Sequence, residues 1–167
     1  MKQYFSTEVI SNIEFNSVVS IDDNNKINFQ TNITNSSLIT NKKVSVYIGV
    51  YFKSILLNSF VMTEKIPCKF YSIFGNSNDK TSNVISNLNT NQLLMDEVIE
   101  YPINFSKFDE IKHIDSELVN ELTNKQRTEE ILHLKEKRLN TINHLRNKIK
   151  IQNILDNITV EIKHQVV

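Results

Sequence analysis

The side chains best suited to proton transfer or metal binding in this sequence are four histidines: His113, His133, His144 and His164. No two of them have the i, i+4 spacing that places two imidazoles on one helical face to bind zinc. His133 and His144 do share a helical face, but about 16 Å of helix rise separates them. We therefore interpret the histidines as solvent-exposed helix residues and expect neither a metal site nor a cofactor.

The other reactive side chains form no catalytic pattern. The only cysteine, Cys68, lies in an apolar alternating stretch without a cysteine-protease signature, which predicts a buried, reduced thiol. The acids between Asp96 and Glu121 offer many carboxylate pairs, but any acidic segment does so, and a solvated face is the simpler interpretation. Two isolated glycines, Gly49 and Gly75, cannot build a phosphate-binding loop. We expect no catalytic residue and no enzymatic activity.

Charge is balanced in total but separated along the chain. Lys+Arg and Asp+Glu number 19 each, while residues 96–121 are mainly acidic and residues 133–150 mainly basic. These segments would attract each other within a fold or between subunits. The basic residues 135–150 raise the alternative of a small phosphate-contacting regulator. Because residues 109–167 lack the aromatic side chains that stack on bases, we do not expect nucleic acid to be the partner.

Composition also bears on source and location. The sequence has no Ala and no Trp, and it is rich in Asn, Ile, Lys and Ser, which indicates an AT-rich genome such as that of a bacterium, phage or virus. No stretch approaches the roughly 20 apolar residues of a membrane span, and Met1–Phe5 lacks the apolar core of a signal peptide. We expect a cytoplasmic protein without a membrane partner.

The first half of the chain has the two-residue periodicity of β-strands with one buried face. The clearest strand runs from Val44 to Lys53, where β-branched and aromatic residues dominate. Other expected strands begin at Ile13 and cover Lys26–Ile33 and about residues 60–74. Because Pro67 lacks a backbone donor, the last of these lies at an edge or contains a bulge. The pattern predicts a four-stranded antiparallel β-meander.

The second half is first irregular and then helical. Residues 75–90 are polar, with a short apolar patch spaced like a helical turn, so we expect weak order there. An apolar stripe with charge opposite it predicts a helix over about residues 116–150, with Asp115 or Ser116 as its cap and room for a break near Thr123 and Asn124. Residues 158–163 return to a two-residue period and predict a short strand.

These elements predict an α+β fold in which the antiparallel meander is followed by a C-terminal helical region. We expect a sheet domain over residues 1–112 and a mainly helical extension over residues 113–167. A helix of the predicted length would extend roughly 50 Å, which is more than such a sheet covers. Part of it should therefore pack against a second helix or another subunit.

The order of these segments resembles the SecB family of export chaperones, over about residues 8–112. The matching segments are Ile10–Phe15, Lys26–Ile33, Val44–Lys53, Lys69–Phe74, Val84–Leu88 and Pro102–Phe105. The resemblance implies a four-stranded antiparallel sheet followed by helices and assembly into oligomers. It also implies capture of unfolded polypeptide clients in apolar grooves. Residues 113–167 form an extension that the family lacks.

The expected function is therefore non-enzymatic binding of polypeptide clients or partner subunits, by a SecB-like chaperone that forms a homo-oligomer. The expected client-binding residues are Tyr47, Tyr51, Phe52, Ile55, Leu56, Leu57 and Phe60. The alternative interpretation of the same residues is an ordinary core or a dimer interface. The alternative function is that of a structural assembly subunit in a phage, viral or multiprotein complex.

Overall fold

The structure is a computed structural model that describes residues 1–99, 102–123 and 128–167. The chain divides into two compact units. The sheet unit consists of Met1–Gln92 and Leu155–Val167, and the helical unit consists of Leu93–Ile154. The predicted boundary after residue 112 lies inside a helix of the helical unit.

The first sheet of the sheet unit has the strand order β1-β2-β3-β6, with each neighbouring pair antiparallel. Its strands are β1 (Lys2–Ile10), β2 (Ile13–Ile21), β3 (Lys26–Asn35) and β6 (Asp79–Asn87). Ser11 and Asn12 turn the chain between β1 and β2 with positive φ angles. Asn adopts positive φ angles more readily than most residues do, which favours a compact turn at this position.

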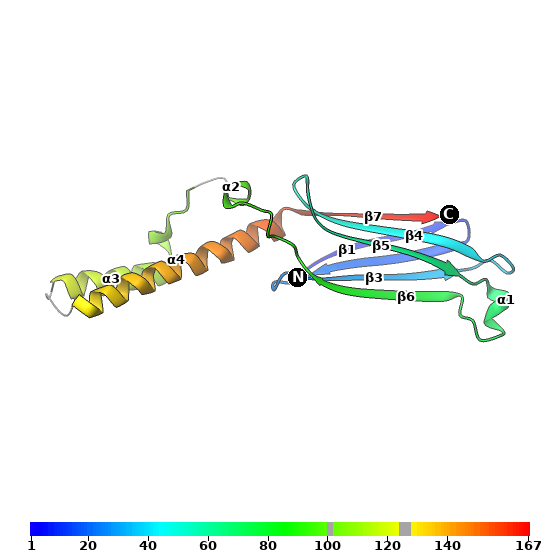
Figure 1. Cartoon of the computed structure of the whole chain (residues 1–167), viewed down its shortest axis with the longest axis horizontal. Coiled ribbons are helices and arrows are strands. Elements are labelled where there is room, and N and C mark those ends of the chain that lie inside the picture. The colour runs from blue at the N-terminus through cyan, green and yellow to red at the C-terminus, as the bar shows by residue number, and fades with distance from the viewer. Residues whose placement is uncertain (100–101, 124–127) are drawn as a thin grey trace. The chain divides into compact units, whose positions relative to one another are not determined.

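The second sheet has the order β5-β4-β7, again antiparallel (Figure 1). Its strands are β4 (Lys42–Phe52), β5 (Ile55–Ile66) and β7 (Ile158–Val166). A short helix, α1 (Lys69–Ser72), lies between β5 and β6 in the sequence. The central strand β4 therefore has one partner next to it in sequence and another from the far end of the sequence.

The core of the sheet unit consists of apolar side chains from the inward faces of both sheets. Alternate residues of β4 are fully buried, namely Val44, Val46, Ile48, Val50 and Phe52. Opposite them lie buried side chains of β2 and β3, including Ile13, Phe15, Val19, Ile27 and Ile33. The rings of Phe29 and Phe60 stack with centroids 5.7 Å apart and join β3 to β5. Burial of these apolar surfaces is the main stabilising contribution of the unit.

The helical unit is described by itself. Its elements are α2 (Met95–Val98), the 3-10 helix η1 (Phe105–Lys107), α3 (Asp109–Thr123) and α4 (Thr128–Asp156), the last of which ends two residues beyond the unit. Arg138 of α4 donates to Asp115 of α3 at 2.6 Å, and Ile111, Ile114, Leu134 and Leu145 are buried. Lys150 donates to the carbonyl of Leu93 at 3.3 Å, which holds the segment before α2 on α4. None of the described helices is long and apolar enough to span a membrane.

The predicted combination of an antiparallel sheet with C-terminal helices is confirmed in outline. Val44–Lys53 is a strand as predicted, with β4 ending at Phe52, but it begins a second sheet instead of continuing the first. The final strand β7 is also as predicted and extends to Val166. The predicted helix is present as two helices with α3 ending at Thr123; Asn124, the other residue of the expected break, lies outside the described residues.

Several expectations about local structure are wrong. Asp115 and Ser116, one of which was expected to cap the long helix, lie inside α3, which begins at Asp109. Residues 69–72, expected at the end of a long strand, form helix α1, because a short apolar run does not distinguish helix from strand. Residues 79–87, expected to be weakly ordered, form strand β6 at a sheet edge, where only one neighbour and little burial are required. Strand β1 was not expected, because its residues lack a clean alternation of apolar and polar types.

Candidate functional site

The predicted client-binding residues all lie on β4 or β5. They differ in how deeply they are buried. Phe52 and Leu57 are buried in the core, and Phe60 is partly buried against Phe29. Ile55 pairs with Phe52 at the turn and is partly buried. The remaining three, Tyr47, Tyr51 and Leu56, reach the surface of the second sheet. Of the seven, only Leu56 is classed as exposed, and Tyr47, Tyr51, Ile55 and Phe60 are partly exposed.

Tyr47 and Tyr51 meet on the outer face of the second sheet. Their hydroxyl oxygens lie 3.0 Å apart, and Tyr51 donates to Oε2 of Glu161 on β7 at 3.2 Å. Gly49 lies between them, and a Cβ atom at that position would lie 2.7 Å from the Tyr47 hydroxyl. The glycine therefore permits the two side chains to cross the strand. We name Tyr47 and Tyr51, which flank Gly49, the tyrosine pair.

The Tyr51 hydroxyl keeps its proton near neutral pH. The hydrogen bond with Tyr47, burial and the negative charge of Glu161 together raise the pKa of Tyr51 to about 12. Lys163, 2.8 Å from Glu161, lowers the pKa of that carboxyl and has its own pKa raised in return. Hydroxyls that stay protonated near neutral pH suit hydrogen bonding and contact with apolar groups, not proton abstraction.

Strand β5, which pairs with the strand that carries the tyrosine pair, presents an open edge on its other side. It pairs with β4 on one side, and no other strand of the described residues pairs with its second side. Near the start of β5 this edge is occupied, because Gln92 donates to the carbonyl of Leu56 at 2.7 Å and Asn58 donates to the carbonyl of Asn87 at 2.9 Å. From Ser59 to Lys65 no described strand pairs with this side of β5, although side chains there contact the first sheet, where Lys80 of β6 donates to Glu64 at 2.9 Å and Phe60 stacks on Phe29. Val61 is 63% exposed there and lies beside Tyr47 in the register.

A separate apolar surface lies at the end of the sheet unit that carries α1 (Figure 1). We name it the apolar tip. It consists of Leu38 and Ile39 in the loop between β3 and β4, and Phe70, Tyr71, Ile73 and Phe74 in α1 and the turn after it, with exposures of 41% to 81%. Backbone bonds from Lys69 to Ser37 and from Phe70 to Leu38 place the two segments side by side. The Phe70 and Phe74 rings pack edge to face at 5.5 Å.

A buried asparagine fixes the base of the apolar tip. Asn35, at the end of β3, is 0% exposed. Its side-chain nitrogen donates to the carbonyls of Thr40 and Ile66, each at 3.0 Å, and its side-chain oxygen accepts from the Ser37 amide at 2.9 Å. The loop and the end of β5 are thus bonded to one rigid residue, so the exposed side chains project from a defined scaffold.

His164 forms a buried hydrogen-bond array with Glu8 and Ser17. Its Nδ1 lies 2.7 Å from Oε1 of Glu8, and its Nε2 lies 2.7 Å from the Ser17 hydroxyl. An ionised carboxylate only accepts, so Nδ1 carries the proton and Nε2 accepts from Ser17. The Ser17 oxygen also lies 3.1 Å from the Thr31 hydroxyl. The expectation that the histidines are solvent-exposed helix residues is wrong for His164, which is a core residue of a strand.

The array resembles a catalytic serine triad in its distances but not in its surroundings. Ser17 is 1% exposed, and it pairs with Ser6 of β1 on one side and Thr31 of β3 on the other. The backbone N–H groups around Ser17 belong to a strand that pairs on both sides, so they do not form an oxyanion hole. Burial lowers the pKa of His164, although Glu8 partly opposes this. The Phe15 ring stacks on the imidazole at 4.6 Å, so the array joins the two sheets.

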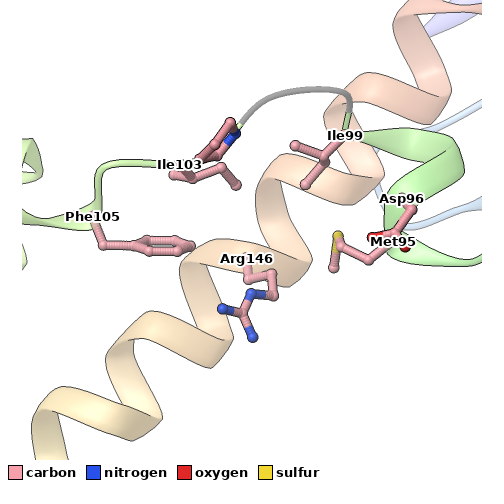
Figure 2. Close-up of a pocket in the computed structure, with 7 residues that line it drawn as sticks. Met95, Asp96, Ile99, Ile103, Phe105 and Arg146 are labelled. Carbon is pink, nitrogen blue, oxygen red and sulfur yellow. The ribbon is translucent and has the colours of Figure 1, made fainter.

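Other candidate groups give no site. Cys68 is a buried free thiol, as predicted. Among the described residues, no group of three or more His, Cys, Asp or Glu side chains could hold a metal ion. A pocket of about 640 Å³ lies in the helical unit (Figure 2), and at its wall the Arg146 guanidinium is 5.5 Å from the centre of the Phe105 ring. Ile99 and Pro102 line this pocket and flank residues outside the described ranges, so its wall is only partly described.

Comparisons with protein-family models, curated proteins and solved structures found no match for this chain. The resemblance to SecB therefore stays a prediction. The surfaces from which function can be argued are the open edge of β5 with the tyrosine pair, and the apolar tip.

Proposed function

We propose that this chain is a non-enzymatic polypeptide-binding module that pairs the open edge of β5 with an extended segment of another polypeptide. The observation that carries the proposal is the edge from Ser59 to Lys65, which has no strand partner among the described residues. An open edge presents backbone donors and acceptors in the spacing that an added strand requires.

The side chains near this edge suit an apolar client. On the outer face, the exposed Val61 would contact a side chain of the added strand, whereas the tyrosine pair lies one strand further away on β4 and bonds to Glu161 of β7. On the inner face, Phe60 is only partly buried and would cover an apolar side chain between the sheets. Backbone hydrogen bonds provide affinity without much sequence demand, which suits unfolded clients.

The resemblance to SecB supports the same function, since it implies capture of unfolded polypeptides in the cytoplasm. Of the residues expected from the sequence, the partly buried Phe60 takes part in this scheme directly, while Tyr47, Tyr51 and Leu56 lie outside the open part of the edge. Phe52 and Leu57 contribute indirectly, because their burial holds the hairpin in place.

The experiment compares two exposed valines on edge strands of different sheets. Val61→Lys places a charge beside the proposed edge, and Val9→Lys places one on the outer face of β1, where Val9 is 69% exposed. Aggregation of denatured, reduced lysozyme is followed by light scattering, with the wild type or a variant of this chain present at a near-stoichiometric ratio to lysozyme. We expect suppression by the wild type and by Val9→Lys, and loss of most of the suppression in Val61→Lys.

Hydrogen exchange locates the contact directly. With an extended apolar peptide bound, amides of Ser59–Lys65 should exchange more slowly, while amides of β1 should not change. No suppression by the wild type, or equal suppression by both variants, would show the proposal to be wrong. Protection of the same amides in a homo-oligomer that does not suppress aggregation would instead assign the edge to subunit assembly.

A further inference from the structure

Lysines surround the apolar tip. Lys42 is the first residue of β4, directly after the loop with Leu38 and Ile39, and Lys69 is the first residue of α1. Lys43 and Lys65 face each other in the register between β4 and β5, one residue from the pair of Lys42 with Ile66. We name these four residues the lysine collar.

The lysine collar carries positive charge that the described residues do not neutralise. None of its four lysines forms an ion pair with a described residue, whereas nearby Lys80 pairs with Glu64 at 2.9 Å. Three of the four, Lys43, Lys65 and Lys69, are exposed, and Lys42 is partly exposed. Unpaired lysines around an apolar surface indicate an anionic partner.

We propose that the apolar tip and the lysine collar dock the sheet unit onto the surface of an anionic lipid bilayer. The six tip side chains would enter the interfacial layer, and the lysine collar would contact lipid phosphates and carboxylates. Aromatic and aliphatic side chains are stable at that depth, and lysines keep their charged ends at the headgroups. Anionic lipids provide the complementary charge.

The chemistry of the tip and the collar favours a bilayer. The tip side chains belong to a loop and to a short helix with the turn after it, and they are 41% to 81% exposed. Lys42 and Lys43 begin β4, Lys65 is the last residue but one of β5, and Lys69 begins α1, so the lysines adjoin the apolar tip segments in the sequence. Apolar side chains with cations next to them match the acyl chains and anionic headgroups of a membrane surface.

Rigidity also favours docking. The hydrogen bonds of Asn35 hold the loop before β4 and the end of β5 in place, so the tip side chains are ordered before contact. Preorganised groups lose less conformational entropy on binding. Surface docking requires no spanning segment, so it is compatible with the described helices, none of which could span a membrane, but it departs from the expectation of no membrane partner.

The test is co-sedimentation of the full chain with phosphatidylcholine vesicles, with and without phosphatidylserine, at low and high salt. We expect binding only when phosphatidylserine is present, with loss of binding at high salt. Ile39→Asp and the double variant Lys43→Glu/Lys65→Glu should each lower the partition coefficient by about tenfold or more. Circular dichroism of each variant confirms that it is folded.

Controls place substitutions of the same types elsewhere in the sheet unit, with one charge reversal in place of two. Ile85→Asp changes an exposed isoleucine on β6, and Lys26→Glu changes an exposed lysine at the start of β3. Both should bind anionic vesicles like the wild type, and so should Val61→Lys, which separates this surface from the β5 edge. Wild-type protein that does not bind anionic vesicles, or Ile39→Asp that binds equally well, would overturn the proposal. Loss of client capture in Ile39→Asp without vesicle binding by the wild type would assign the tip to a polypeptide instead.

Discussion

Nε2 of His164 lies 2.7 Å from the hydroxyl oxygen of Ser17, and this contact crosses from the second sheet to the first. The other ring nitrogen of His164 bonds to Glu8 on β1. One side chain of β7 therefore connects to two strands of the opposite sheet. Buried polar networks of this kind are costly to leave partly unsatisfied, so they favour one arrangement of the sheets.

The buried imidazole should make stability depend on pH. Burial lowers the pKa of His164 below its ordinary value of 6.5, so the folded state holds the neutral ring more strongly than the unfolded state does. The stability is fully present above pH 6.5 and declines as the pH falls below that value. We expect the free energy of unfolding in urea to be constant just above pH 6.5 and to fall as the pH is lowered from that value.

Substitution identifies the responsible histidine. His164→Gln should remove most of this decline, because glutamine keeps hydrogen-bonding capacity but does not titrate. His133→Gln, at an exposed position of α4, should retain it. An unchanged pH dependence in His164→Gln would contradict the assignment.

Removal of the hydrogen bond between Tyr47 and Tyr51 should change the pKa of Tyr51, which NMR can measure. Tyr47→Phe removes the first of the causes that raise the pKa of Tyr51 to about 12, so that pKa should move toward the ordinary value of 10.0. Carbon NMR of labelled tyrosine, titrated over alkaline pH, measures it. Tyr71→Phe in the apolar tip is the control and should leave Tyr51 unchanged; a shift of equal size there would argue against the hydrogen bond.

Asn35 should contribute more stability than its strand neighbour Asn32. Asn35→Ala leaves the carbonyls of Thr40 and Ile66 without their donor in a buried site, which should cost about 1–3 kcal/mol. Asn32→Ala loses one exposed bond to Thr81 and should cost less than about 1 kcal/mol. Urea denaturation at neutral pH measures both free energies, and equal values would mean that the buried bonds add nothing.

The ion pair between α3 and α4 should have a small effect. Asp115 and Arg138 are each about one third exposed, with side-chain values of 37% and 33%. Asp115→Asn should therefore cost less than about 1 kcal/mol, and high salt should reduce the difference from the wild type. Thermal unfolding followed by helical circular dichroism tests this, with Glu136→Gln on α4 as a charge-matched control. A loss of several kcal/mol would indicate a buried pair instead.

Some of this fold could be predicted from local pattern. Strand β4 follows from the alternation of β-branched and aromatic residues, and α4 follows from a long stretch without Pro or Gly. The meeting of Tyr47 and Tyr51 is consistent with the same alternation, since residues four apart on a strand share a face. The assignment of strands to two sheets did not follow, because alternation identifies a buried face but not its neighbour.

The parts that could not be predicted depend on distant pairing. Ser17 and His164 are 147 positions apart, and they meet only because β7 pairs with β4. Strand β6 lies at an edge, where Ser82, Val84 and Ser86 need only partial burial, so its sequence lacks an apolar period. The apolar tip was hidden for a related reason, since its exposed aromatic residues have the composition of a buried strand.

The position of β7 in the sequence also sets an order of events during synthesis. The other strands of the sheet unit precede the whole helical unit, but β7 follows it. At about 5–20 residues per second, a ribosome needs several seconds to produce the intervening residues. During that interval β4 lacks one neighbour and Ser17 lacks its imidazole partner. The nascent sheet unit is therefore an incomplete sandwich with an exposed apolar strand, and this is the stage at which we expect it to be most prone to misassociation.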